Sequence, residues 1–152
     1  MTEARIGWGG KVYLGTDNTE ATLTLLDEVV DTTFPQDETE EVEATHLTSP
    51  GRRKEFLSGL IDGGDVTLTL NYVPGGATDL LLTAALSAGT TRSVRFVIPD
   101  ETGTGTADWN ITTSGFVKRY APDRMSAGEK ISATAVIRIT GAQEQGAGAA
   151  GS

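Results

Sequence analysis

Residues that could perform catalysis or bind a metal are scarce in this sequence of 152 residues. There is one histidine, His46, and no cysteine, which excludes a cysteine nucleophile and a thiolate zinc site. No second histidine at helical spacing, calcium loop, phosphate loop or G-x-S-x-G turn is present. The sequence therefore predicts no enzyme activity, no metal site and no cofactor.

The acidic residues and two tryptophans leave one other class of function open. Carboxylates on a β scaffold, together with Trp8 and Trp109, are also found in proteins that handle sugars. A non-catalytic β-sandwich binding module, either a carbohydrate-binding domain or a decoration protein, is therefore kept as the alternative interpretation.

The net charge argues against nucleic acid as a partner, and the lack of long apolar runs argues against a membrane. The formal net charge is -9, whereas a surface that grips nucleic acid must supply clustered Lys and Arg to neutralise phosphates. No run of residues approaches the ~18 apolar side chains that a membrane span requires. Specific DNA binding and membrane insertion are therefore not expected.

The charges are unevenly distributed along the chain. No cation lies between Lys11 and Arg52, while this stretch contains ten Asp and Glu residues. The basic run Arg52, Arg53 and Lys54 follows directly. We interpret this imbalance as a docking code, in which the cations of one copy meet acidic surface of another.

Alternation of apolar and polar residues predicts a protein made mainly of β-strands. In residues 65–73, Val66, Leu68 and Leu70 alternate with polar residues, as in a strand with one buried face. Similar patterns or β-rich composition predict strands at 11–16, 21–34, 41–47, 92–100, 107–120 and 130–141. One helix is expected between a cap at Thr78 or Asp79 and a stop at Gly89. This content favours a β-sandwich with one flanking helix.

The segment between the strands at 41–47 and 65–73 is too long for an ordinary hairpin turn. Its apolar residues have roughly helical spacing and should be buried, either by folding back as a short helix or against a second copy. A contact with a second copy would be heterologous and would generate rings or filaments. The expected subunit or ring interface consists of Ser49, Pro50, Gly51, Arg52, Arg53, Lys54, Glu55, Phe56, Leu57, Leu60 and Ile61.

Several short motifs follow one another in an order that suggests a known family. Gly7-Trp8-Gly9 precedes the first expected strand, and the long loop fits S-P-x-x-x-x-E-F-x-x-G-L-x-D-x-G from Ser49 to Gly64. The strand after it fits V-x-L-x-x-N-Y from Val66 to Tyr72. Further matches are Asp79–Leu81, Arg95–Asp100 and Thr140–Gly141. Over residues 6–141 the chain resembles the tail tube proteins of long-tailed, siphovirus-like bacteriophages and related gene transfer particles.

The resemblance implies a fold, an assembly and a location. The fold would be a β-sandwich or barrel-like tail tube fold with one flanking helix and a long inter-strand loop, in a tube domain of residues 1–141. Residues 142–152 lie outside the resemblance, and their small, polar composition predicts a flexible Gly/Ala-rich tail. Hexameric rings would stack into a hollow virion tail tube, assembled in the bacterial host cytoplasm. Its partners would be further copies of itself and the tail terminator, tape measure and distal tail proteins.

DNA would pass through the lumen of such a tube without specific binding, because acidic walls repel a polyanion. The expected lumen-lining residues lie on the polar faces of two predicted strands. They are Glu41, Glu43, Thr67, Thr69 and Asn71.

Overall fold

The computed structural model of the chain describes residues 10–18, 23–47, 50–99 and 108–147. Within these ranges the elements are, in chain order, β1 (Lys11–Leu14), β2 (Thr24–Leu25), β3 (Val29–Thr32), β4 (Glu38–Glu43), a 3-10 turn (Pro50–Arg52), β5 (Phe56–Asp62), β6 (Asp65–Asn71), α1 (Ala77–Ala88), β7 (Arg92–Ile98), β8 (Trp109–Pro122), β9 (Ser132–Ile139) and β10 (Glu144–Ala147). The prediction of a mainly β protein with one helix is confirmed for the described residues.

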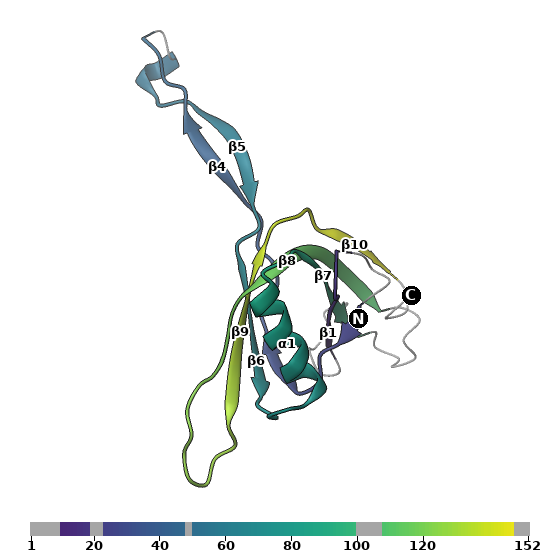
Figure 1. Cartoon of the computed structure of the whole chain (residues 1–152). Helices are drawn as coiled ribbons and strands as arrows, with labels where there is room; N and C mark the ends of the chain where they lie inside the picture. The colour runs from purple at the N-terminus through teal and green to yellow at the C-terminus, as the bar shows by residue number, and fades with distance from the viewer. Residues whose placement is uncertain (1–9, 19–22, 48–49, 100–107, 148–152) are drawn as a thin grey trace, which may run out of the picture.

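One antiparallel sheet, with strand order β2-β1-β7-β8-β9-β6-β3, forms the body of the molecule (Figure 1). β8 joins the two halves of this sheet, because residues 109–115 pair with β7 and residues 115–122 pair with β9. The register shifts between Val117 and Arg119, and a bulge of this kind bends the strand. The sheet therefore folds over itself into two layers, as expected of a sandwich.

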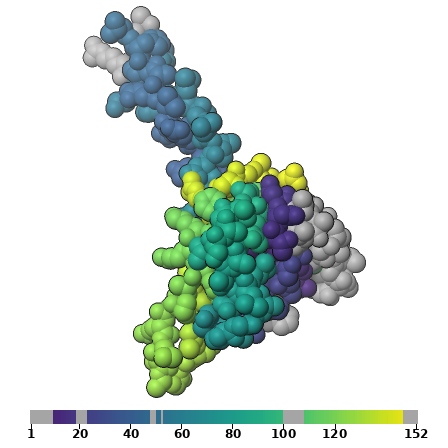
Figure 2. Space-filling model, in the orientation of Figure 1, coloured from purple at the N-terminus to yellow at the C-terminus, as the bar shows by residue number. Residues whose placement is uncertain are grey.

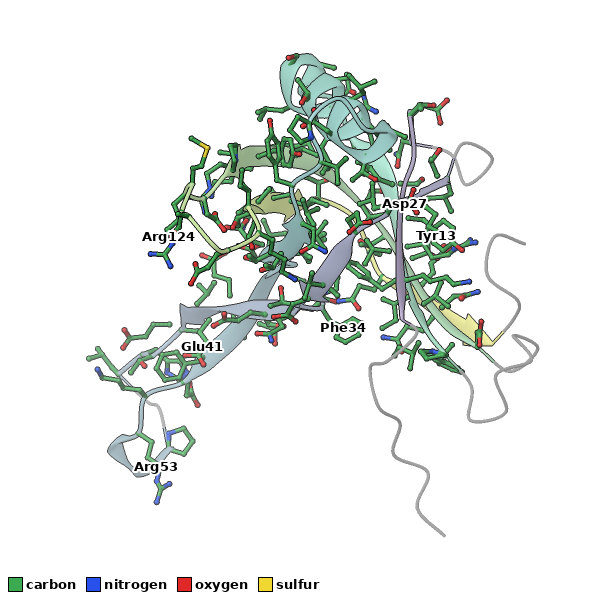
Figure 3. All side chains as sticks on the ribbon, turned by 90° about the horizontal axis from the view of Figure 1, so that it is seen from below. Tyr13, Asp27, Phe34, Glu41, Arg53 and Arg124 are labelled. Atoms are coloured by element: carbon green, nitrogen blue, oxygen red, sulfur yellow. The ribbon has the colours of Figure 1, made fainter. Side chains whose placement is uncertain are left out.

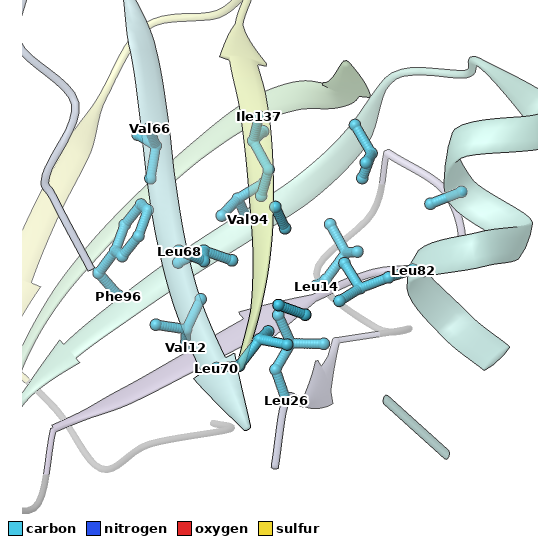
Figure 4. Packing of buried hydrophobic residues seen from close by; sticks show 14 of the residues in the cluster. Val12, Leu14, Leu26, Val66, Leu68, Leu70, Leu82, Val94, Phe96 and Ile137 are labelled. Atoms are coloured by element: carbon cyan, nitrogen blue, oxygen red, sulfur yellow. The ribbon is translucent and has the colours of Figure 1, made fainter. Parts of the chain in front are cut away.

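The hydrophobic core lies between these layers (Figure 4). On β6, Val66, Leu68 and Leu70 are buried, while the polar residues between them are partly exposed on the other face. Strands β1 and β7 contribute facing side chains, among them Val12, Leu14, Val94 and Phe96, and β9, which pairs with β6, adds Ile137 beside Val66. The alternation predicted from the sequence is therefore confirmed on β6.

Helix α1 packs against β8 and contributes Leu82 and Ala85 to the core. The Tyr120 hydroxyl on β8 donates a 2.8 Å hydrogen bond to the Asp79 carboxylate, and burial together with this bond raises the pKa of Tyr120. The stop at Gly89 is confirmed, because this residue adopts the left-handed conformation that glycine tolerates. The expected cap was wrong, since the helix begins after Gly76.

Strands β4 and β5 form a separate two-stranded sheet that projects from the body (Figures 1 and 2). We call residues 38–62 the arm. Residues 56–62 were expected in a loop or a short helix, and this is wrong because they form β5. The strand expected at 41–47 instead spans Glu38–Glu43.

Two other segments differ from the predicted strands. The strand expected at 21–34 is divided into β2 and β3 by a turn in which Glu28 has a φ of 66°. At the other end of the chain, residues 144–147 form β10 and pair with β8, which extends the sheet beyond the expected domain boundary at residue 141. Residues 148–152 of the expected tail lie outside the described residues.

Gly115 lies where β8 changes its partner strand, and no side chain fits there. A Cβ atom on this residue would lie 2.6 Å from the Arg138 carbonyl oxygen and 2.9 Å from Ile137 Cγ2. We expect Gly115→Ala to lower the free energy of unfolding by about 1–3 kcal/mol, as overpacking of a tight core does. Denaturant unfolding with Gly146→Ala as the control measures this, because nothing lies within 4 Å of a Cβ there. Equal stability of the two variants would contradict the packing described.

Candidate assembly surface

The arm is held together by backbone pairing between β4 and β5. Glu43 pairs with Phe56, Val42 with Leu57, and Thr39 with Ile61, with a register shift between Thr39 and Glu41. Beyond β4 the Ala44 N–H donates to the Glu55 carbonyl at 2.7 Å. The Glu55 N–H in turn donates to Thr45 Oγ1 at 2.9 Å. These bonds keep the ribbon paired toward its far end.

Apolar side chains lie exposed on both faces of the arm. Directly paired residues share a face, so Val42 and Leu57 lie on one side and Phe56 and Ile61 lie on the other. Phe56 is 54% exposed, Leu57 61% and Ile61 68%, although residues of this type are usually buried. Burying each would contribute roughly 1.5–3 kcal/mol, and a hairpin without such packing is marginally stable. The arm therefore has the character of a surface that a partner covers.

Charge is unevenly distributed along the arm. Glu41 lies on β4, nearer the body than Arg53, which lies at the far end, as Figure 3 shows. Lys54, beside Arg53, is also exposed. His46 lies 3.1 Å from Glu55 at the same end. The basic run predicted to be an interface is thus placed at the end farthest from the body.

A cleft of about 1180 Å³ lies between the base of the arm, the middle of β8 and the end of β9. Its walls include the apolar residues Leu60 and Ile61 on the arm and Phe116 on β8. Five carboxylates also line it: Asp37, Glu38, Glu40, Glu41 and Asp62. Because the elements that form this cleft are far apart in sequence, no single motif predicted it.

Among the described residues, Arg138 is the cationic side chain that lines this cleft. It already forms ion pairs with carboxylates of its own chain. Its guanidinium lies 2.7 Å from Asp62 and 3.6 Å from Asp65. The Gly64 N–H and Arg138 hold the pKa of Asp62 below its usual range. Asp62 raises the pKa of Arg138 in return. This arrangement links the base of the arm to the body and leaves the other carboxylates of the cleft without that cation.

The residues expected to line a lumen do not lie together. Thr67, Thr69 and Asn71 lie on the outward face of β6, whereas Glu41 and Glu43 lie on the arm. On the body, charges near the face of β6 occur in pairs, such as Lys118 with Asp65 at 3.3 Å. The Asp and Glu side chains between positions 37 and 43 therefore lie on the arm and at its base. The outward face of β6 is polar and has charges of both signs near it.

The structure describes most of the expected interface residues, and those that it describes lie on the arm. Ser49 and the side chain of Arg52 lie outside the described part of the chain. Sequence reasoning did not single out Val42 and Leu47, whose apolar side chains are also exposed on the arm, at 44% and 106%. A signal was present in the sequence, because each is an apolar residue outside the alternating pattern of the strands that form the core.

The described residues contain no group of three or more His, Cys, Asp or Glu that could hold a metal ion. The one described helix is too short to cross a membrane.

The sequence was compared with models of protein families and with curated proteins. A family model described as lambda phage tail tube protein matches residues 11–146. Comparison of the sequence with curated proteins gives no significant match.

Solved structures share the fold at low sequence identity. The tail of an empty GTA particle, computed with C6 symmetry, superposes with a TM-score of 0.70 at 17% identity, covering 93% of this chain and 98% of that chain. The SPP1 tail tube gives 0.66 at 11% identity, covering 95% and 80%. The tube terminating cap of the anti-feeding prophage gives 0.70 at 12% identity, covering 97% and 93%.

Proposed function

The chain belongs to the lambda phage tail tube protein family, and from this we propose that it is a structural subunit that polymerises into the hollow tube of a phage-like tail. Six copies form a ring, and rings stack along the tube. Six-fold symmetry is suggested by the GTA tail, which has the same fold. The protein is not an enzyme in this proposal; its role is to build a conduit.

The observation that carries the proposal is the arm. It exposes apolar side chains on both faces, yet it adds no residue to the core of its own body. A second copy of the chain supplies the missing cover, because polymerisation guarantees its presence at the same site in every subunit. The interface residues are those from Ser49 to Ile61 expected from the sequence.

The lumen is proposed to be lined by the outward face of β6, with Thr67, Thr69 and Asn71. These side chains are uncharged and the chain as a whole has a net charge of -9, so the wall does not attract DNA strongly. DNA then slides through the tube during delivery into the host. Glu41 and Glu43 serve the contact between copies in preference to the lumen, because they lie on the arm.

The remaining partners are proposed from the family. The tube ends on a tail terminator at one side and on distal tail proteins at the other, and it encloses a tape measure protein. The subunit folds in the host cytoplasm and is found in the virion tail. The likeness in fold to a tube terminating cap fits an assembly in which related folds meet end to end.

The test is self-assembly of the purified chain. We expect a monomer at low concentration that converts to uniform hollow tubes on concentration, followed by sedimentation and negative-stain electron microscopy. Conversion should depend steeply on protein concentration, since each added ring offers the next docking surface. A protein that stays monomeric at high concentration, with and without a tail initiator complex, would refute the proposed function.

A further inference from the structure

We propose that the basic far end of one copy's arm binds in the acidic cleft at the base of the arm of a second copy. This inference rests on the proposed function and names the two surfaces that meet. The contact joins copies head to tail along the tube.

The cleft has the chemistry of a receptor for a cationic and partly apolar segment. Leu60 and Ile61 are 82% and 68% exposed where they line it. No ion pair of the described residues includes the carboxylates of Asp37, Glu38, Glu40 and Glu41. Arg138 is held by Asp62 and Asp65 on its own chain. Cations from another copy would therefore relieve the repulsion among these four carboxylates.

The end of the arm has the complementary chemistry. Arg53 and Lys54 are exposed there, and the apolar side chain of Leu47 is 106% exposed beside them. In the sequence, Arg52, Arg53 and Lys54 are followed by a single acid, Glu55, which lies 3.1 Å from His46. Arg53 and Lys54 take part in no ion pair among the described residues, so the segment offers positive charge and an apolar anchor.

The other projecting segment fits the cleft less well. Residues 123–131 connect β8 to β9, and residues 123–130 of this segment are exposed, with Met125 at 86%. Their two cations, Arg124 and Lys130, are balanced by two acids, Asp123 and Glu129, so the segment has no net charge. Arg124 also pairs with Glu129 at 3.4 Å. We therefore assign the cleft to the arm.

One copy cannot make this contact with itself, because the cleft and the basic end lie at opposite ends of one ribbon. The two surfaces differ, so the contact is heterologous and repeats from copy to copy without closing on a pair. Asp37 and Pro50 are 13 residues apart, which span at most about 45 Å when extended. The step between successive copies along the arm is therefore no longer than about 45 Å.

Cysteine cross-linking tests the contact directly, because the chain has no cysteine of its own. Tubes of the double variant Leu47→Cys, Leu60→Cys are treated with a short bismaleimide and analysed on a denaturing gel. We expect a ladder of covalent multimers, because every copy carries one cysteine at the end of its arm and one in its cleft. An equal mixture of the two single variants should give dimers only. Within one chain the two positions lie roughly 20 Å apart along the strands, too far for an internal bridge.

The pairs Met125→Cys, Leu60→Cys and Met125→Cys, Leu47→Cys are the matched controls and should give no ladder. If tubes form but only the Met125→Cys, Leu60→Cys pair gives a ladder, the β8–β9 connection occupies the cleft and our assignment is overturned, while the proposed function stands. Tubes that give no ladder with any pair also overturn it. Failure of the wild-type chain to form tubes would instead refute the proposed function, and the inference with it.

A charge exchange covers the case in which the cysteine variants do not assemble. Arg53→Glu, Lys54→Glu alone and Glu40→Lys, Glu41→Lys alone should each lose tube formation. A mixture of the two variants should recover tube formation, because opposite charges meet at every joint where the two variants alternate. Normal assembly of either variant alone, or no recovery in the mixture, would contradict the contact.

Discussion

A chain whose arm is removed is expected to fold as a monomer and to form no tubes. In this variant residues 39–61 are replaced by Asn-Gly, which suits a two-residue hairpin turn between Glu38 and Asp62, a directly paired couple. The core is unchanged, because it contains no residue of the arm. The pairing of Asp62 with Arg138 is kept.

The expected loss of assembly is complete, since every joint between copies uses the arm. Sedimentation velocity and negative-stain microscopy measure it, and circular dichroism with thermal unfolding checks that the body keeps its fold. Wild-type protein assembled in parallel is the control. Tubes formed by the folded, arm-deleted variant would show that the arm is dispensable and would contradict the proposed interface.

Two phenylalanines should separate folding from assembly. Phe96 is 1% exposed in the core and lies edge to face with Phe34, with ring centroids 5.8 Å apart. Phe96→Ala should lower the free energy of unfolding by about 3–5 kcal/mol, and so lower the Tm by roughly 6–20 °C. This is a large share of the ~5–15 kcal/mol that stabilises an ordinary domain.

Phe56→Ala is the matched change on the arm. Phe56 is 54% exposed, so its loss should change the free energy of unfolding of the monomer by less than about 0.5 kcal/mol. It should nevertheless weaken polymerisation strongly, because burial of this ring against another copy is lost. Calorimetry at low concentration and the critical concentration for tube formation measure the two effects. If Phe56→Ala destabilised the monomer as much as Phe96→Ala, the arm would belong to the body's own core.

The sequence predicted the elements that bury one face against the core. Val66, Leu68 and Leu70 on β6 alternate strictly with polar residues, and the structure confirms their burial. The helix stop at Gly89 was equally readable, because a left-handed residue without a side chain is a strong signal. The first pattern reflects packing within a single copy, and the second reflects the local conformation of the backbone.

The arm was mistaken for a loop because it has no core of its own to impose alternation. Its apolar residues lie on both faces, and the register shift opposite Thr39 and Glu41 interrupts the strand period around Gly59 and Leu60. Phe56, Leu57, Leu60 and Ile61 therefore have a spacing that imitates a helix. The expectation that they contact a second copy stays a prediction.

The C-terminal strand and the cleft depend on tertiary structure. Residues 144–147 have low β propensity, and their pairing is imposed by the open edge of β8. The cleft combines residues 37–41 and 60–63 with residues from β8 and from the end of β9. These segments, which are far apart in the sequence, become neighbours only when the sheet folds over itself.

A helical reconstruction of the assembled protein by electron cryomicroscopy tests the central claim most directly. It should show a hollow tube in which each arm is covered on both faces by other copies, with the outward face of β6 toward the lumen. A tube in which the arms project free into solvent, or a compact closed oligomer without a lumen, would contradict the account.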